Sequence, residues 1–251
     1  MISRTASAAC DGPLTQRARE SRRDIRLGLL RGFELRSAEG VVHLPISAQR
    51  LLAFLALHDR PLHRTYVAGA LWLKHGDEQG QACLRSALWR LNSQGLRLVD
   101  SRARDLQLLP AIEVDSRLVA AIARRIVGNG DESATKDADD LIRAGELLPD
   151  WYDDWVMIER ERLRQLRLHA LEIVCRRLAA MRLFGPAVDA GLAAVLDEPL
   201  RESAQRALIE AHLAEGNRSE AIRQYNSYRE RLYTELRLEP SPGLRRLALD
   251  Y

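Results

Sequence analysis

The chain has 251 residues, of which 46% are hydrophobic, 29% charged and only 5% aromatic. This length allows a full hydrophobic core in one large or two small domains, and the composition favours a mainly helical protein over a β-sandwich. No apolar run reaches the roughly 18 residues that a membrane-spanning helix needs, so the composition argues against a transmembrane role. We therefore expect a cytoplasmic protein.

The net charge of +3 conceals a division between the two halves of the chain. Residues 1–110 carry a net charge of +7, whereas residues 111–251 carry −4. A basic half joined to an acidic half predicts that only the first half meets a polyanion. All basic residues except Lys74 and Lys136 are arginines. We attribute that bias to GC-rich coding rather than to DNA binding.

Residues 1–24 contain five arginines among serine, alanine and threonine, without the apolar segment of a secretion signal. We expect a disordered basic tail that either touches DNA phosphates or is passive. Three cysteines, Cys10, Cys83 and Cys175, are odd in number and lack the spacing of metal ligands. Cys83 and Cys175 lie in helical patterns, where we expect small buried thiols in a reducing compartment.

Two strands and two helices are predicted between residues 25 and 73. Residues 25–35 and 41–44 have the character of strands, with a turn near residues 37–40. Pro45 and Ser47 announce a helix for which Ser47 is a plausible N-cap. A second helix is expected over residues 64–73. Its predicted buried residues are Val67, Ala70 and Leu71.

A 32-residue stretch, Asp77 to Leu108, predicts one long helix followed directly by a hairpin. Leu84, Ala87, Leu88 and Leu91 form one apolar stripe at the helical period. The opposite side of this helix carries small and polar residues and one tryptophan, edged by arginines. These residues are Gln79, Ala82, Ser86, Trp89 and Ser93, with Arg85 and Arg90 at the edges.

Gly95 ends the helix, and residues 96–99 and 105–109 have the character of short strands joined by a loop that holds Arg102 and Arg104. Such a helix fits the major groove of DNA and such a hairpin reaches nearby phosphates or the minor groove, which outlines a winged helix-turn-helix. The candidate DNA-binding residues are Arg85, Ser86, Trp89, Arg90, Ser93, Arg102 and Arg104. We expect Trp89 to pack beneath the wing, the alternative being that it lies against the DNA backbone.

Three segments of the first half resemble a known family when taken in order. They are residues 48–57 (AQRLLAFLAL), Leu71-Trp72, and residues 84–91 (LRSALWRL). In this order and spacing they resemble the N-terminal domain of the antibiotic regulatory protein (SARP) class of bacterial transcriptional activators. That resemblance implies a winged-helix DNA-binding domain of the response-regulator type, which we place at residues 25–112.

After the polar segment 131–133 the chain is almost wholly helical. One long amphipathic helix over residues 163–178 is predicted to end at residues 184–186, and further breaks are expected at Gly185, 198–199 and 216–217. Gly185 and Gly216 lie 31 residues apart, close to the repeat length of tetratricopeptide (TPR) helix pairs. We therefore expect a TPR-like all-helical domain over residues 113–251.

Three further segments resemble the bacterial transcriptional activator domain, the TPR-like module of the same regulator class. They are residues 146–155 (ELLPDWYDDW), 197–202 (DEPLRE) and 238–244 (LEPSPGL). Arg237 departs from the family, which commonly has a glycine at that position, so the turn geometry there is in question. Within the first of these segments, Trp151, Tyr152 and Trp155 are expected to be core or interface residues rather than a ligand cage.

The sequence offers little for catalysis. The six histidines form no metal-ligand pair, no glycine-rich phosphate loop is present, and the adjacent Asp153 and Asp154 make a poor general acid/base pair. We expect no enzyme activity, no cofactor and no metal.

The resemblance implies a sequence-specific activator that binds direct repeats in promoter DNA, as two protomers side by side, and recruits RNA polymerase. Target genes in secondary metabolism and a position at the nucleoid follow from the family alone. Two alternatives stay open. One is a TPR-type scaffold whose winged helix binds protein, and the other is a ligand-sensing repressor with the same DNA-binding half.

Overall fold

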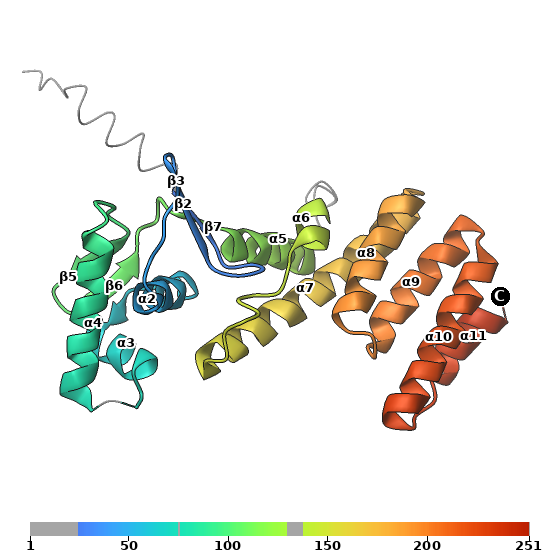
Figure 1. Cartoon of the computed structure of the whole chain (residues 1–251). Helices are drawn as coiled ribbons and strands as arrows, with labels where there is room; N and C mark the ends of the chain where they lie inside the picture. The colour runs from blue at the N-terminus through green and yellow to red at the C-terminus, as the bar shows by residue number, and fades with distance from the viewer. Residues whose placement is uncertain (1–24, 75, 130–137, 251) are drawn as a thin grey trace, which may run out of the picture. The chain divides into compact units, whose positions relative to one another are not determined.

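The computed structural model describes residues 25–74, 76–129 and 138–250, and the chain divides into two compact units, Met1–Asp115 and Ser116–Tyr251 (Figure 1). The predicted basic tail and the predicted connection at residues 131–133 lie outside the described residues. The domain limits predicted at residues 25, 112 and 113 stay predictions.

In its described residues, the first unit combines two small sheets with the helices α2, α3 and α4. Its elements are β1 (Arg26–Gly28), β2 (Glu34–Ser37), β3 (Gly40–Val41), α2 (Ile46–Ala56), β4 (Leu62–His63), α3 (Arg64–Leu71), α4 (Asp77–Asn92), β5 (Val99–Arg102), β6 (Asp105–Leu108) and β7 (Glu113–Val114). One sheet has the strand order β3-β2-β1-β7, in which β7 runs parallel to β1. The other sheet has the order β4-β6-β5 and is antiparallel.

The segment 25–35 is a hairpin rather than one strand. Arg31 and Gly32 have φ angles of 66° and 136°, and this left-handed backbone reverses the chain between β1 and β2. Leu27 then pairs with Leu35 across the hairpin, and both side chains are buried. The alternation of apolar residues correctly predicts strands in this segment. It does not indicate the residue at which the chain reverses between two strands.

The predicted helix after Pro45 is present, but Ser47 is not its N-cap. Pro45 occupies the cap position with extended backbone, and Ser47 lies inside the first turn. Proline suits this place because its missing N–H would find no partner in the first turn of a helix. In α3 the buried alanine is Ala68, whereas Ala70 is half-buried.

The predicted helix and hairpin between residues 77 and 108 are confirmed. Helix α4 buries Leu84, Ala87 and Leu91, and it approaches α3 closely at Gly80, where an added Cβ would lie 3.6 Å from the Ala68 carbonyl oxygen. Gly95, with a φ of 71°, follows the end of the helix. The first strand of the wing begins at Val99 rather than at Leu96, because the register of β5 with β6 starts at Val99, and Leu98 only accepts one hydrogen bond, from the Leu109 N–H at 3.0 Å.

The regular elements of the second unit, within its described residues, are helices. Its helices are α5 (Asp115–Asn129, whose first residue belongs to the first unit), α6 (Ala138–Arg143), α7 (Asp154–Ala180), α8 (Phe184–Asp197), α9 (Glu202–Glu215), α10 (Arg218–Leu236) and α11 (Pro242–Leu249). From α7 to α10, consecutive helices pack against each other (Figure 1). The fold class is confirmed: mainly helical with small sheets, a winged region followed by a TPR-like helical domain.

The breaks predicted at residues 198–199 and 216–217 are confirmed, but the break at Gly185 is wrong. Helix α7 ends at Ala180, and the chain turns at Arg182, which has a φ of 62°. Gly185 and Pro186 lie in the first turn of α8. A proline there costs no hydrogen bond, so a Gly-Pro pair that resembles a helix break can instead open a helix.

Candidate nucleic-acid interface

Helix α4 presents one polar face to solvent. Its first turn carries Asp77 and Glu78, whose charge suits the positive end of the helix dipole, and its last turn carries Arg90. The five candidate residues on or next to this helix, Arg85, Ser86, Trp89, Arg90 and Ser93, are all exposed. The structure therefore brings the predicted helical contacts together on one surface.

Trp89 does not pack beneath the wing as expected. Its side chain is 70% exposed, although it lies beside the wing and lines a hollow there. The core beneath α4 is already filled by Leu84, Ala87 and Leu91. Since Trp89 is directed away from that apolar stripe by its position on the helix, no buried space is left for it. A large aromatic ring kept in solvent on a polar helix face is available to a partner.

Arg85 and Arg90 lie at opposite edges of the exposed face. The Arg90 Nη1 atom donates a hydrogen bond to the Ser47 Oγ of α2 at 3.3 Å, and the Ser93 Oγ donates to the Arg90 carbonyl oxygen at 2.9 Å. Among the described residues, the Arg85 side chain has no hydrogen-bond or ion-pair partner. Arg85 is thus the freer of the two guanidinium groups.

The wing holds its two arginines differently. Arg102 is the last residue of β5 rather than part of the loop, and its Nε lies 2.8 Å from the Asp100 Oδ2. Arg104 is in the turn itself, next to Ala103, whose φ is 33°. Its side chain has no partner among the described residues. The Arg104 carbonyl oxygen accepts a hydrogen bond from the Arg64 backbone N–H at 2.8 Å, which ties the wing turn to the start of α3.

Hollows lie on both sides of α4. The one beside the wing has a volume of about 500 Å³ and is lined by Arg85, Trp89, Arg64 and Arg97, among others. The one on the side of α2 has a volume of about 580 Å³ and includes Ser86, Arg90 and Glu78. The polar ridge of the helix thus stands between two depressions.

Arg64 and Arg97 are members of this surface that sequence reasoning missed. Arg97 follows the helix and was placed in a predicted strand, and Arg64 begins a different helix. The Arg64 Nη2 donates to the Ser101 Oγ of β5. The antiparallel wing and the packing of α3 on α4 bring them together, so only their basic character was visible in the sequence.

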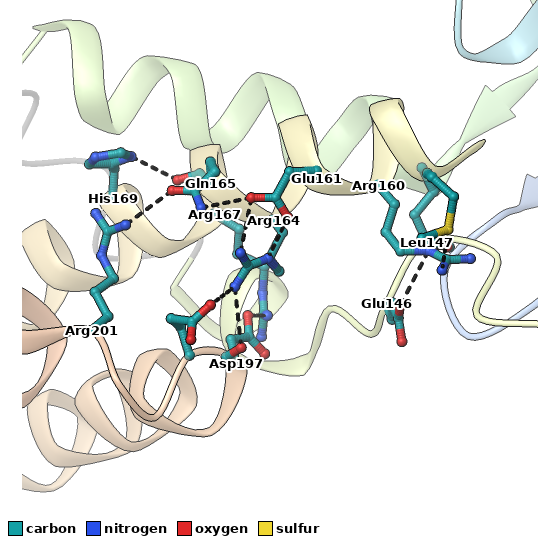
Figure 2. A network of polar contacts seen from close by, with 12 residues as sticks. Glu146, Leu147, Arg160, Glu161, Arg164, Gln165, Arg167, His169, Asp197 and Arg201 are labelled. Atoms are coloured by element: carbon teal, nitrogen blue, oxygen red, sulfur yellow. Dashed lines mark hydrogen bonds and ion pairs between the residues drawn. The ribbon is translucent and has the colours of Figure 1, made fainter. Parts of the chain in front are cut away.

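Arginines of α7 in the second unit serve a different purpose, because they bind the segments that separate the helices (Figure 2). Arg160 donates to the carbonyl oxygens of Leu147, Leu148 and Trp151 and lies 3.2 Å from the Glu146 carboxylate. Residues 146–151, part of the segment 146–155 that resembles the bacterial transcriptional activator domain, are therefore held by one guanidinium group. Because Arg160 binds backbone carbonyl oxygens of this segment, the side chains of the segment do not predict the contact.

The segment 197–202 is held by a row of ion pairs on the same helix (Figure 2). Arg167 binds Asp197, and Arg164 binds Glu198. Further along, the Arg201 Nε donates to the Glu172 Oε1 at 2.6 Å. The charged residues of this motif thus fasten the connection between α8 and α9 to α7.

Two members of this network are buried charges. Arg167 is 8% exposed, and its Nε and Nη2 donate to the carbonyl oxygens of Leu141 and Ile142 at 2.7 and 3.2 Å. Burial lowers the pKa of Arg167 to about 10, so it stays charged at neutral pH. Glu172 is 5% exposed and accepts from Arg201 and Ser203. Both charges have the partners that a buried ion requires.

The third motif is joined to the second. The Glu202 Oε2 accepts from the backbone N–H of Ser241 at 2.9 Å, and the Ser241 Oγ in turn accepts from the Leu244 N–H at 3.2 Å as the N-cap of α11. Arg237, the departure from the family pattern, has a φ of 58° and a ψ of 31° at the end of α10. The left-handed turn is kept, although a side chain now occupies it.

The aromatic residues near the start of α7 divide in their environment. Trp151 and Trp155 are half-buried and meet edge to face with ring centroids 6.3 Å apart, as a structural role predicts. Tyr152 is 81% exposed, so it is not a core residue, and the other half of the expectation, an interface residue, stays a prediction. Cys175 is buried, donates to the Ala207 carbonyl oxygen at 3.3 Å, and has its pKa raised by burial to about 12. Cys83 is half-buried rather than buried.

Within residues 25–74, 76–129 and 138–250, no group of three or more His, Cys, Asp or Glu side chains is arranged to hold a metal ion. In the same residues, no helix is both long and apolar enough to traverse a membrane.

Comparisons with known proteins agree with this description. Residues 132–250 match the family of the bacterial transcriptional activator domain. The structure is similar to EmbR of Mycobacterium tuberculosis, solved in complex with a low-affinity phosphopeptide, with a TM-score of 0.71 and 21% sequence identity. The similarity covers 89% of this chain but only 64% of the length of EmbR. No curated protein sequence matches this chain.

Proposed function

From the match of residues 132–250 to the bacterial transcriptional activator domain, the fold shared with EmbR and the resemblance of the first half to SARP regulators, we propose that this chain is an activator of the SARP type that binds promoter DNA sequence-specifically. The observation that carries the proposal is the exposed face of α4. It holds an arginine with no side-chain partner among the described residues, two serines and an exposed tryptophan, on a helix whose other face buries Leu84, Ala87 and Leu91. An α-helix of this kind fits the major groove, which is about 12 Å wide.

In this arrangement the two edges of α4 have different tasks. Arg85 is free to form bidentate hydrogen bonds to guanine, the commonest specific contact in the major groove. Arg90 is partly held by Ser47 and faces the neighbouring DNA strand. Ser86 and Ser93 supply additional donors, and Trp89 lies against the sugar-phosphate backbone, which was the second alternative for this residue.

The wing reaches the adjacent groove. Arg104 at its turn is the main contact there because no described residue competes for its guanidinium group. Arg102 contributes less, since it must share its charge with Asp100 at 2.8 Å. The bond between the wing turn and the start of α3 fixes the distance between wing and helix, and such preorganisation reduces the entropy lost on binding.

The helical domain mediates contacts between protomers or with RNA polymerase. Two protomers side by side on direct repeats, polymerase recruitment and target genes in secondary metabolism are the specific form in which the SARP type performs activation. We propose that this chain acts in that form, in the cytoplasm at the nucleoid.

The test is binding to the intergenic DNA upstream of its own gene, compared with scrambled DNA of equal length, by fluorescence anisotropy at two salt concentrations. We expect at least about tenfold preference, or roughly 1.4 kcal/mol, with affinity falling as salt rises. Loss of all binding at low salt would exclude the DNA-binding function and favour a scaffold that binds protein. Transcription with purified RNA polymerase then separates an activator from a repressor.

A further inference from the structure

The hollow between α4 and the wing differs in charge from two neighbouring hollows that the described residues of this unit form. Arg64, Arg85 and Arg97 line it, together with Trp89, Asn92 and Ser101, and no carboxylate is among its lining residues. The hollow on the other side of α4 contains Glu78, and the one beside the wing turn contains Asp77 and Glu78. Three arginines thus line one depression, and no carboxylate in its described wall offsets their charge.

These three cations have few partners in the protein. Among the described residues, the side chains of Arg85 and Arg97 make no hydrogen bond or ion pair, and Arg64 donates only to the neutral hydroxyl of Ser101. Asp100, the acidic residue of the adjacent strand, is occupied by Arg102. Like charges that converge without compensation repel each other, so an anion in the hollow would relieve that repulsion.

Chain geometry indicates which anion reaches this place. If α4 lies in the major groove and the wing turn lies in the adjacent minor groove, the backbone that separates the two grooves must pass between helix and wing. That passage is the hollow. Guanidinium groups bind phosphate oxygens with paired, charge-assisted hydrogen bonds, and an amide such as that of Asn92 adds a neutral donor.

We propose that the hollow formed by Arg64, Arg85 and Arg97 is a phosphate-binding site that takes a phosphodiester of the DNA backbone between the two grooves. This rests on the proposed function, and it adds Arg64 and Arg97 as residues that position the protein on DNA. Arg97 reads no base. Its contribution is therefore independent of sequence, whereas that of Arg85 includes base recognition.

The first test replaces Arg97 by glutamine, since its side chain is exposed and has no described partner, so folding is expected to be unaffected. Arg97→Gln should weaken binding about tenfold at moderate salt, by the same factor for upstream and scrambled DNA. The slope of log affinity against log salt should fall by about 1. Arg64→Gln should act alike. Arg229→Gln, which removes an exposed arginine of α10, is the control for the loss of one charge.

Ethylation interference on the upstream DNA locates the phosphate. In the wild-type protein, ethylation of one phosphate at the edge of the protected region should block binding. With Arg97→Gln, ethylation of that phosphate should no longer matter, while other interfering positions persist. If Arg97→Gln binds like Arg229→Gln while Arg85→Ala loses its preference for the upstream DNA, the site is refuted and the DNA-binding function is retained. If the wild-type protein binds no DNA, both fail.

A free phosphate could use the same chemistry, and a separate measurement distinguishes it. Inorganic phosphate is titrated at constant ionic strength while tryptophan fluorescence is followed in the wild-type protein and in Trp89→Phe. No saturable, Trp89-dependent change at millimolar phosphate agrees with a DNA phosphodiester as the ligand. A saturable change that Arg97→Gln abolishes, together with competition against DNA, would assign the hollow to a free anion and overturn the backbone proposal.

Discussion

The arginines of α4 and the wing and the arginines of α7 are the same residue in two opposite environments. On α4 and around it, Arg85, Arg97 and Arg104 are exposed and have no side-chain partner among the described residues. On α7, Arg160, Arg164 and Arg167 each have several partners and lie half-buried or buried. The first group keeps its hydrogen-bonding capacity for another molecule, and the second group has already used it.

The contrast extends to what a family resemblance means in each half. In the second unit, the segments that resemble the bacterial transcriptional activator domain are the segments fastened by ion pairs and carbonyl contacts, as Asp197 and Glu202 illustrate. These motifs therefore contain the residues that hold the helical domain together. In the first unit, the similar motif over residues 84–91 mixes buried leucines with exposed arginines, so it combines architecture with a candidate interface.

The strongest expected contrast concerns the two described cysteines. Burial raises the pKa of Cys175 to about 12 from its ordinary value of 9.0, so near pH 8 its thiolate is roughly 1000-fold rarer than that of an unperturbed thiol. Alkylation followed by mass spectrometry should modify half-buried Cys83 in the native protein and Cys175 only in denaturant. The Cys175 thiol ionises at a lower pH in the unfolded chain than in the folded protein. Its contribution to the free energy of unfolding should therefore fall as pH rises from 9 towards 12. Rapid native alkylation of Cys175 would contradict its described burial.

Arg167→Ala is expected to destabilise the second unit by about 3 kcal/mol. The substitution leaves Asp197 without its ion-pair partner and removes the donor to the Leu141 and Ile142 carbonyl oxygens. Urea unfolding followed by far-ultraviolet circular dichroism measures the change. Arg164→Ala is the matched control and should cost only about 1 kcal/mol, because Arg164 and Glu198 are 29% and 33% exposed. Equal effects of the two variants would show that burial does not set their contributions.

Arg85→Ala should change DNA binding and leave stability unchanged to within about 0.5 kcal/mol. Affinity for the upstream DNA should fall about tenfold, and most of the preference over scrambled DNA should disappear, since a bidentate contact to guanine contributes roughly 1–3 kcal/mol. Fluorescence anisotropy with both duplexes gives the ratio. An unchanged ratio would mean that Arg85 contacts phosphate alone.

The two wing arginines should differ from each other. Arg104→Ala is expected to weaken binding about fivefold and to reduce the salt dependence by about one phosphate contact. Arg102→Ala should weaken binding only about twofold, because the Asp100 carboxylate at 2.8 Å already offsets its charge. Asp100→Asn should release Arg102 and strengthen binding slightly. The reverse order of effects for Arg102 and Arg104 would contradict this account of the wing.

The smallest expected effect concerns Arg237. Its left-handed conformation costs about 1 kcal/mol for a residue with a side chain, and its guanidinium carbon lies 5.3 Å from the Tyr233 ring centroid, a contact that returns about 0.5 kcal/mol. Arg237→Gly should therefore stabilise the second unit by about 0.5 kcal/mol in urea unfolding. Arg237→Ala keeps the strain and loses the ring contact, so it should be slightly less stable than the wild type.

The periodicity of apolar residues was sufficient to predict the helices. It was insufficient to predict where each helix ends and which residues pack against it. Three residues of the predicted stripe, Leu84, Ala87 and Leu91, are buried because burial of one helical face follows directly from spacing, whereas the fourth, Leu88, is half-buried. The turn at Arg31, the start of α8 at Phe184 and the exposure of Trp89 were not predicted. Each depends on how distant elements of the fold pack around the residue, and the local sequence does not determine that packing.

The sequence by itself determined the two-part architecture, the helical face of residues 79–93 and the family resemblance, because all three follow from local patterns of apolar, polar and motif residues. Only the tertiary structure decided which arginines are free and which are paired. Arg64 and Arg97 meet at one hollow although 33 positions separate them, and Arg167 meets Asp197 across 30 positions. A guanidinium group has the same chemistry in every sequence, and its role is set by the carboxylates and carbonyl oxygens that folding brings within reach.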